Sequence, residues 1–433
     1  MISPKPTDPL EGKNTLLSKV LIVGTTEDYV EWIRQASPDR AVFLVDREDR
    51  QRRCLSCPSS PDEVITDLDQ MDAVRKELTL YLQAGKVTID GIVCFDCEYM
   101  ALAAGLADIF HLPYPSLAAI EHCRNKYLSK IIWEKHGVNC PGVRLIRSLK
   151  DAFLFFNEMN LPCVLKPVSG SGSELVFICR NAGDIRHAYE RIESGLEKRA
   201  DLAMYRNEKS SSIVMETFAD GSEYSCDFVI EDKHVAILRL TRKMYYPFGP
   251  FGTTWAYILT SRSAIQTGEK DLEELLADAA GSLGIDRSIC MVDFIIQGDD
   301  VVFLEMTPRP GGDCLPHLLK TVRGFDMLQF AMDFSSGKPV VLPSSIHHEE
   351  PMMGVRIFAG ANGILKTIHT ENVRKDKRIL DVYLKYPSGH QVTMPPEDYD
   401  SWILGHVVYK PEPARNLELQ LEELKQKIIV EIE

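Results

Sequence analysis

Two acidic residues interrupt apolar runs in MVDFIIQGDDVVFLEMTPRPGGD, residues 291–313. Asp293 stands in the first run and Glu305 in the second, with a short polar turn between them. If the turn is centred on Asp299, the two acids oppose each other on one face of a hairpin, whereas a tight turn at Gly298 and Asp299 would shift the register and separate them. Buried, opposed carboxylates repel and require a cation between them, and hard oxygen ligands favour Mg²⁺.

A second candidate site follows the apolar stretch LPCVLK, which ends on Lys166. The backbone N–H groups of a glycine-rich turn can approach a phosphate closely, and the preceding lysine supplies positive charge. The spacing is not that of a Walker A loop, and a Gly/Ser hairpin beside a surface lysine is the alternative. The residues of this turn are Ser169, Gly170, Ser171 and Gly172.

Two further acids stand at strand ends in SIVMETFADGSEYSCDFVI, where Glu216 closes one apolar run and Glu223 opens the next. The order of lysine, glycine-rich loop, strand with Glu216, then Glu223 and the acidic hairpin resembles the ATP-grasp superfamily, and in particular L-amino-acid ligases. The resemblance covers residues 120–335, roughly half the chain. It implies ATP and Mg²⁺ as cofactors.

The resemblance also implies roles for single positions. Lys126 and Lys166 correspond to phosphate-binding lysines, Glu216 to the residue that faces the exocyclic amine of adenine, and Glu223 to an acceptor for ribose hydroxyls. Backbone groups of an extended segment can recognise a purine edge, and a carboxylate is a strong acceptor for hydroxyl donors. The segment implied to read the ring edge is Thr217, Phe218 and Ala219.

In the hairpin, Asp293 and Glu305 match the magnesium carboxylates of the superfamily. Thr307 stands where the superfamily usually has asparagine, and its hydroxyl can still ligate a metal. Arg309 is expected to hold the transferred phosphate or an anionic intermediate. Alternate residues of a strand share a face, so the side chains at 305, 307 and 309 can point into one cleft. The following Gly311 and Gly312 are expected to let the chain approach substrate.

An aromatic segment, LTRKMYYPFGPFGTTWAYILTS, lies between these motifs at residues 240–261. We expect it to line the carboxylate or amino-acid pocket, with Lys243 near phosphate and acting in catalysis. Tyr245, Phe251 and Trp255 would then shape specificity. Packing of this loop on the core is the alternative.

Strand and helix patterns alternate through KVLIVGTT, EDYVEWIRQAS and AVFLVD, which predicts a doubly wound α/β domain. VGTTEDYV lacks the spacing of a dinucleotide-binding fingerprint, so nicotinamide binding is not supported. The fold class is therefore α/β, of ATP-grasp type. The expected organisation is a flexible leader over 1–15, an N-terminal preATP-grasp α/β domain over 16–118, a linker helix and α+β lid subdomain over 119–215, a second α+β subdomain with the metal site over 216–338, and a β-rich module with a closing helix over 339–433.

The composition limits the classes of partner. The 433 residues carry a formal net charge of -14, which argues against a broad binding surface for nucleic acid. No apolar run approaches the roughly 20 residues that span a bilayer, and the N-terminal stretch lacks a signal-peptide pattern. We expect a cytoplasmic location, no membrane association, and small-molecule carboxylate and amine partners. A homodimer is one candidate assembly.

The 11 cysteines favour reduced thiols over a disulfide framework. Cys54 with Cys57, and Cys94 with Cys97, have a spacing that a four-thiolate zinc site permits. The alternative is that GIVCFDCEYMALAAGLA forms a buried strand that leads into a helix, which makes Cys94 a small core residue.

The resemblance implies a two-step reaction in which a carboxylate attacks the terminal phosphate of ATP and an amine then displaces phosphate from the acyl carbon. Positive charge near the phosphates supplies most of the rate enhancement in such transfers, and water must be excluded from the acyl phosphate. The leading hypothesis is therefore an ADP-forming carboxylate-amine ligase. Two alternatives stay open: a biotin-carboxylase-like enzyme that forms carboxyphosphate, and a nucleotide-binding protein without catalysis.

Overall fold

The computed structural model describes residues 17–48, 50, 60–200, 212–342 and 350–433. The predicted leader over 1–15 lies outside the described residues, and so does the cysteine pair Cys54 and Cys57. Within the described ranges, every helix is too short or too polar to cross a membrane.

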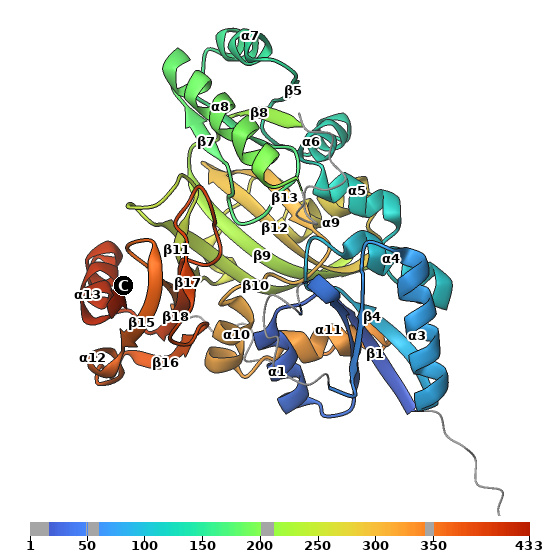
Figure 1. Cartoon of the computed structure of the whole chain (residues 1–433). Coiled ribbons are helices and arrows are strands. Elements are labelled where there is room, and N and C mark those ends of the chain that lie inside the picture. The colour runs from blue at the N-terminus through green and yellow to red at the C-terminus, as the bar shows by residue number, and fades with distance from the viewer. Residues whose placement is uncertain (1–16, 49, 51–59, 201–211, 343–349) are drawn as a thin grey trace, which may run out of the picture.

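The N-terminal domain is a parallel sheet in the order β3-β2-β1-β4, with helices on both faces (Figure 1). Val20 and Ile22 of the central strand β1 pack towards α1 and α11, whereas Leu21 and Val23 pack towards α3 and α4. This arrangement confirms the doubly wound prediction. The elements are β1 (Leu17–Val23), α1 (Glu27–Ala36), β2 (Ala41–Asp46), β3 (Glu63–Thr66), α3 (Met71–Gly85), β4 (Val87–Val93), α4 (Met100–Phe110) and α11 (Met327–Ser335).

A smaller lid subdomain stands above the rest of the molecule in Figure 1, where it is drawn in green. Its four antiparallel strands have the order β5-β8-β6-β7, and α7 and α8 pack their apolar residues against them. Two helices lead into it from the N-terminal domain. The elements are α5 (Leu117–Arg124), α6 (Lys126–Lys135), β5 (Val143–Ile146), α7 (Leu149–Met159), β6 (Cys163–Pro167), β7 (Phe177–Cys179), α8 (Ala182–Lys198) and β8 (Ile213–Thr217).

A long sheet in the order β13-β12-β9-β10-β11-β14-β18-β16 runs through the remainder of the chain. α9 packs on one face of its first strands, and α10 lies with α11 on the other. The C-terminal strands extend this sheet, a continuity that the sequence did not predict. The elements are β9 (Ser222–Glu231), β10 (His234–Tyr245), β11 (Thr254–Leu259), η1 (Arg262–Ala264), α9 (Leu272–Ser282), β12 (Arg287–Gln297), β13 (Asp300–Thr307), α10 (Leu315–Arg323), β14 (Met353–Phe358), β16 (Ile379–Leu384) and β18 (Ile403–Tyr409).

The C-terminal region also holds a small sheet of β15 (Gly363–His369), β17 (Gln391–Val392) and β19 (Ile429–Ile432), together with α12 (Glu371–Arg374) and α13 (Leu417–Lys427). The prediction that a helix closes this region was partly wrong, because the β-branched residues after α13 form the strand β19 and pair with β15.

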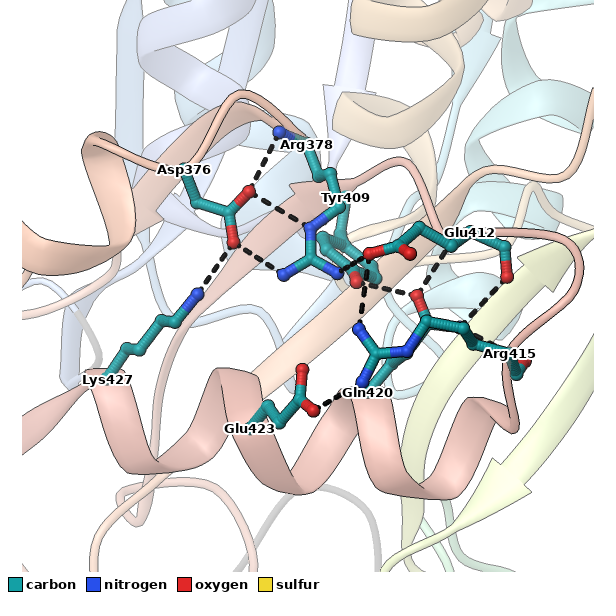
Figure 2. A network of polar contacts seen from close by, with 8 residues as sticks. All are labelled: Asp376, Arg378, Tyr409, Glu412, Arg415, Gln420, Glu423 and Lys427. Atoms are coloured by element: carbon teal, nitrogen blue, oxygen red, sulfur yellow. Dashed lines mark hydrogen bonds and ion pairs between the residues drawn. The ribbon is translucent and has the colours of Figure 1, made fainter.

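A polar network fixes α13 to its surroundings (Figure 2). Asp376 accepts hydrogen bonds from Lys427 at 2.7 Å and from Arg378. Gln420 accepts from the hydroxyl of Tyr409 on β18 at 2.9 Å. The helix is thus held near both ends by hydrogen bonds to the residues around it.

Candidate functional site

The two acids of the hairpin face each other across β12 and β13. Asp293 pairs with Glu305, as one of the two predicted registers required. The turn itself is nevertheless tight, because Gln297 pairs with Asp300. An irregularity beside Asp293 leaves Leu304 as the extra residue of β13, and this bulge restores the opposed register.

A buried lysine, Lys130, contacts the bulge through its ammonium group. Its ammonium donates to the carbonyl of Leu304 and lies 3.2 Å from one oxygen of Glu216. The other oxygen of Glu216 accepts from Lys166 at 2.7 Å. Burial lowers the pKa of Lys130 to about 8, although the negative charge of Glu216 acts to raise it. Burial opposes ionisation of Glu216, but the two lysines outweigh it and hold the pKa of Glu216 below its usual value.

Sequence reasoning missed Lys130, although a signal was present. It lies four residues after Lys126 on α6, so both side chains leave the same helix face. Asn125, which stands before Lys126, caps this helix by accepting from the backbone N–H groups of Tyr127 and Leu128. The cap and the spacing together place both ammonium groups beside the hairpin.

Lys243 of β10 bridges two carboxylates from neighbouring strands. Its Nζ lies 2.7 Å from Glu223 and 2.5 Å from Asp293. Burial alone would lower the pKa of Lys243, but these two carboxylates raise it well above its usual value. The hydroxyl of Tyr245 donates to the second oxygen of Glu223. Lys243 therefore carries a positive charge in the middle of the acidic group.

The two opposed acids have different charge environments. Burial raises the pKa of Asp293, and the positive charge of Lys243 lowers it only in part. The negative charges of Glu223 and Glu305 raise this pKa further. Burial would raise the pKa of Glu305 as well, but the surrounding lysines, led by Lys126, bring it to about 2. The Nζ of Lys126 lies 3.4 Å from Glu305.

One oxygen of Asp293 is buried and has no hydrogen-bond partner among the described residues. A buried carboxylate oxygen without a donor is costly, and a bound cation would satisfy it. Two opposed carboxylates are also the usual protein contribution to a Mg²⁺ site that is completed by phosphates and water. Asp293 and Glu305 therefore fit a magnesium ion.

Two cavities meet at this pair of acids. The first has a volume of about 260 Å³ and lies between the lid subdomain and the hairpin. The second has a volume of about 240 Å³ and extends towards the N-terminal domain. Both cavities are lined by Lys126, Gly170, Ser171, Ser173, Lys243, Asp293 and Glu305.

Most of the predicted site residues line these cavities. Those in the first cavity alone are Lys166, Ser169, Glu216, Thr217, Phe218, Ala219, Glu223, Tyr245 and Phe251. Those in the second cavity alone are Gly172, Thr307, Arg309 and Gly312.

Trp255 and Gly311 differ from the prediction, since neither is among the residues that line the two cavities. Trp255 is 4% exposed and packs in the core of the C-terminal region, in a T-shaped ring contact with Tyr246. The core-packing alternative therefore holds for Trp255. The backbone N–H of Gly311 donates instead to the buried Asp227, and a Cβ there would lie only 2.9 Å from that carboxylate. Gly311 is a packing position.

Three arginines line the second cavity: Arg124, Arg309 and Arg356. The guanidinium of Arg309 donates from two nitrogens to the sulfur of Cys97, at 3.1 and 2.9 Å. Arg356, which sequence reasoning missed, donates to Asp313 at 2.7 Å and to the carbonyl of Thr254 at 3.1 Å. The only sequence signal was an arginine inside the apolar strand MMGVRIF. The second cavity thus combines arginine side chains with the acids of the hairpin.

The zinc alternative gains no support from the described residues. None of their histidine, cysteine, aspartate and glutamate side chains form a group of three or more that could hold a metal. Cys94 is a buried core residue, as the alternative predicted, and Cys97 contacts Arg309.

Residues 159–317, which include the glycine-rich loop, Glu216 and the whole hairpin, match the ATP-grasp domain family. This part of the chain is an ATP-grasp domain. The resemblance predicted from the order of the motifs is therefore confirmed.

Two curated proteins are similar to the chain over more residues than this domain has. Formate-dependent phosphoribosylglycinamide formyltransferase of Wolinella succinogenes is 23% identical over 321 residues, 72% of this chain and 73% of that protein. D-alanine–D-alanine ligase of Neisseria meningitidis is 24% identical over 213 residues, 48% of this chain and 65% of that protein. Among the first curated relatives, the aligned part spans between 32% and 73% of the relative's own length.

The crystal structure of L-amino acid ligase from Bacillus licheniformis superposes with a TM-score of 0.74. The superposition covers 97% of this chain and 100% of that protein, at 17% sequence identity. At this identity the likeness establishes the ATP-grasp fold along the chain.

Proposed function

We propose that this ATP-grasp chain is an ATP-dependent carboxylate-amine ligase that forms an amide through an acyl phosphate and releases ADP and phosphate. The observation that carries the proposal is the meeting of two cavities at Asp293 and Glu305. In this arrangement one cavity takes the nucleotide, and the other takes the carboxylate and amine substrates. The terminal phosphate would lie between the two acids and the lysines around them. ATP dependence also fits the expected cytoplasmic location.

The first cavity suits ATP. Lys126 and Lys166 supply positive charge for the phosphates, and the loop from Ser169 to Gly172 supplies backbone N–H groups. Glu223 is an acceptor for ribose hydroxyls, and the extended segment at 217–219 offers backbone groups to the purine. Because Lys130 and Lys166 hold Glu216 ionised, its carboxylate can accept from an exocyclic amine while it keeps the lysines in place.

A magnesium ion held by Asp293 and Glu305 would neutralise negative charge on the phosphates during transfer. The protein supplies the remaining charge: Lys126 and Lys243 lie beside the two acids on the side where the cavities join. The Thr307 hydroxyl lies on the same strand face as Glu305, where it can add an oxygen ligand.

The second cavity suits an anion that becomes an acyl phosphate. The guanidinium groups of Arg309 and Arg356 face this space, and both can bind carboxylate or phosphate oxygens in two-point geometry. Thr307 and Gly312 line the same wall. Gly170, Ser171 and Ser173 lie over the junction of the cavities, where they exclude water from a reactive intermediate.

A screen of ADP release over pairs of amino acids and related acids, with Mg²⁺-ATP, tests the proposal. Bicarbonate forms a separate arm, because carboxyphosphate would require no larger acid. ADP release that depends on both an organic acid and an amine supports the ligase. ADP release with bicarbonate alone favours the carboxyphosphate enzyme, and nucleotide binding without ADP release in any arm favours the non-catalytic alternative.

A further inference from the structure

Arg199, which directly follows α8 in the lid subdomain, contacts a distant part of the chain. Its side chain is buried, and the whole residue is 5% exposed. One guanidinium nitrogen donates to the carbonyl of Glu397 at 3.1 Å and also to the carbonyl of Pro396. These acceptors belong to the C-terminal region, so one side chain joins the lid to a segment that lies 198 positions further along the sequence.

The same guanidinium also holds the wall of the first cavity. Its Nε donates to the carboxylate of Glu174 at 2.8 Å, and another nitrogen donates to the carbonyl of Gly195 at 3.0 Å. Glu174 lines the first cavity, directly after Ser173 and the glycine-rich loop. Arg199 therefore links that loop to the C-terminal region.

The loop next to this link is held in a strained conformation. Ser173 and Leu175 have φ angles of 62° and 54°, in the left-handed region that side chains other than glycine rarely adopt. Such a residue costs about 1–3 kcal/mol and persists only where its surroundings enforce it. The surroundings here are the contact of the Ser173 hydroxyl with the carbonyl of Gly252, at 3.0 Å, and the burial of Leu175 against Gly195.

A tyrosine of the C-terminal region completes the contact. The ring of Tyr399 lies 6.0 Å from the guanidinium of Arg199. Arg199 thus contacts the segment at 396–399 both through hydrogen bonds to its carbonyls and through the ring of Tyr399.

We propose that Arg199 is a positioning residue that latches the loop over the phosphate site to the C-terminal region and so sets how long a nucleotide stays bound. This inference rests on the proposed nucleotide site. Nucleotide release requires the lid loop to move, and movement must break the bonds of Arg199 to Glu174 and to the two carbonyls. Lysine cannot replace this residue, because its single ammonium lacks the planar fork that reaches acceptors on both sides.

Hydrogen exchange measured by mass spectrometry tests the latch without substrate. Arg199→Gln and Arg199→Lys are compared with wild type and with Arg144→Gln. Arg144 makes an exposed ion pair with Glu158 at 2.8 Å in the same subdomain, which makes it a matched control. The latch predicts faster exchange in the peptides that cover 169–176 and 395–400 in both Arg199 variants, and no change in the control. Faster exchange confined to α8 would show a local structural role and overturn the latch.

The second measurement is the dissociation rate of a fluorescent ATP analogue with Mg²⁺. Loss of the charge-assisted hydrogen bonds of Arg199 should raise this rate about tenfold in both variants, while Arg144→Gln matches wild type. Unchanged dissociation with faster loop exchange would overturn the effect on nucleotide retention. If the wild type binds no analogue, the proposed nucleotide site fails, and the exchange pattern alone then decides the latch. Arg199→Lys keeps the charge and the apolar stem, so it guards against a misfolded glutamine variant.

Discussion

Asp293 and Glu305 lie directly opposite each other on neighbouring strands, although the tight turn between these strands, at Gln297 and Asp300, would by itself put them out of register. A single extra residue, Leu304, restores the pairing, and the ammonium of Lys130 donates a hydrogen bond to the carbonyl of Leu304. Bulges often re-aim side chains next to active sites. Here the bulge brings two carboxylates to one face, at the junction of the two cavities.

The unequal environments of the two acids predict opposite effects of neutral substitutions when no metal is bound. The folded state raises the pKa of Asp293, so Asp293→Asn removes a charge that costs stability. The pKa of Glu305 is lowered to about 2, so Glu305→Gln removes a charge that the lysines stabilise. In EDTA, we expect the melting temperature to rise or stay level in the first variant and to fall in the second.

Both variants should lose phosphoryl transfer, because each leaves the metal without one carboxylate. Melting temperature with and without Mg²⁺-ATP, measured beside ADP release, checks this. Normal turnover in either variant would remove that residue from the metal site.

The lowered pKa of Lys130 should make the free energy of unfolding depend on pH. Its pKa falls from 10.5 to about 8 on folding, so the unfolded chain binds more protons between these values. Stability rises with pH wherever the unfolded state binds more protons, so this group adds free energy of unfolding as pH rises from about 8 to 10.5. Lys130→Met lacks this contribution. Urea denaturation at several pH values should show that the wild type gains relative to the variant; parallel curves would contradict the assignment.

Lys166 should contribute directly to nucleotide affinity. Lys166→Ala removes a cation from the first cavity and leaves Glu216 with only Lys130, so the Kd for Mg²⁺-ATP should rise about tenfold or more. Lys150, an exposed lysine of the same subdomain, provides the control Lys150→Ala, which should bind like wild type. Calorimetry measures both, and equal affinities for wild type and Lys166→Ala would place Lys166 outside the site.

Two aromatic residues of the segment at 240–261 should have different roles, one in ligand binding and one in stability. Phe251 lines the first cavity, so Phe251→Ala should weaken nucleotide binding with little loss of stability. Trp255 is a core residue, so Trp255→Ala should cost about 3–5 kcal/mol of stability. Chemical denaturation and nucleotide titration of the two variants separate these effects. A stable Trp255→Ala protein with altered substrate choice would restore the pocket prediction.

The sequence predicted the site largely through the order of its charged residues. Each of these charged residues opens, interrupts or ends an apolar run, where a buried charge is costly unless it is paired or binds a ligand. They are Lys166, Glu216, Glu223, Asp293 and Glu305. The bulge at Leu304 could not be predicted. The residues of a turn indicate the register next to the turn, but a residue inserted further along the strand changes the register beyond it.

Other misses came from contacts that are distant in the sequence. Arg356 reaches the second cavity only because β14 joins the sheet beside β11, a pairing of strands almost 100 residues apart. Trp255 stands in a strand whose residues are all buried, so burial along the strand does not separate a core position from a pocket position. Only the position of the C-terminal strands shows that its side chain packs in a core. The strand β19 was hidden because its apolar residues continue those of α13.

The most direct test of the ligase proposal is to trap the acyl phosphate with hydroxylamine. The protein is incubated with Mg²⁺-ATP, a carboxylate found in the ADP-release screen, and hydroxylamine in place of the amine. We predict that a hydroxamate forms in equal amount to ADP and phosphate, and that Glu305→Gln forms none. Release of ADP without hydroxamate, or of AMP and pyrophosphate, would contradict the account.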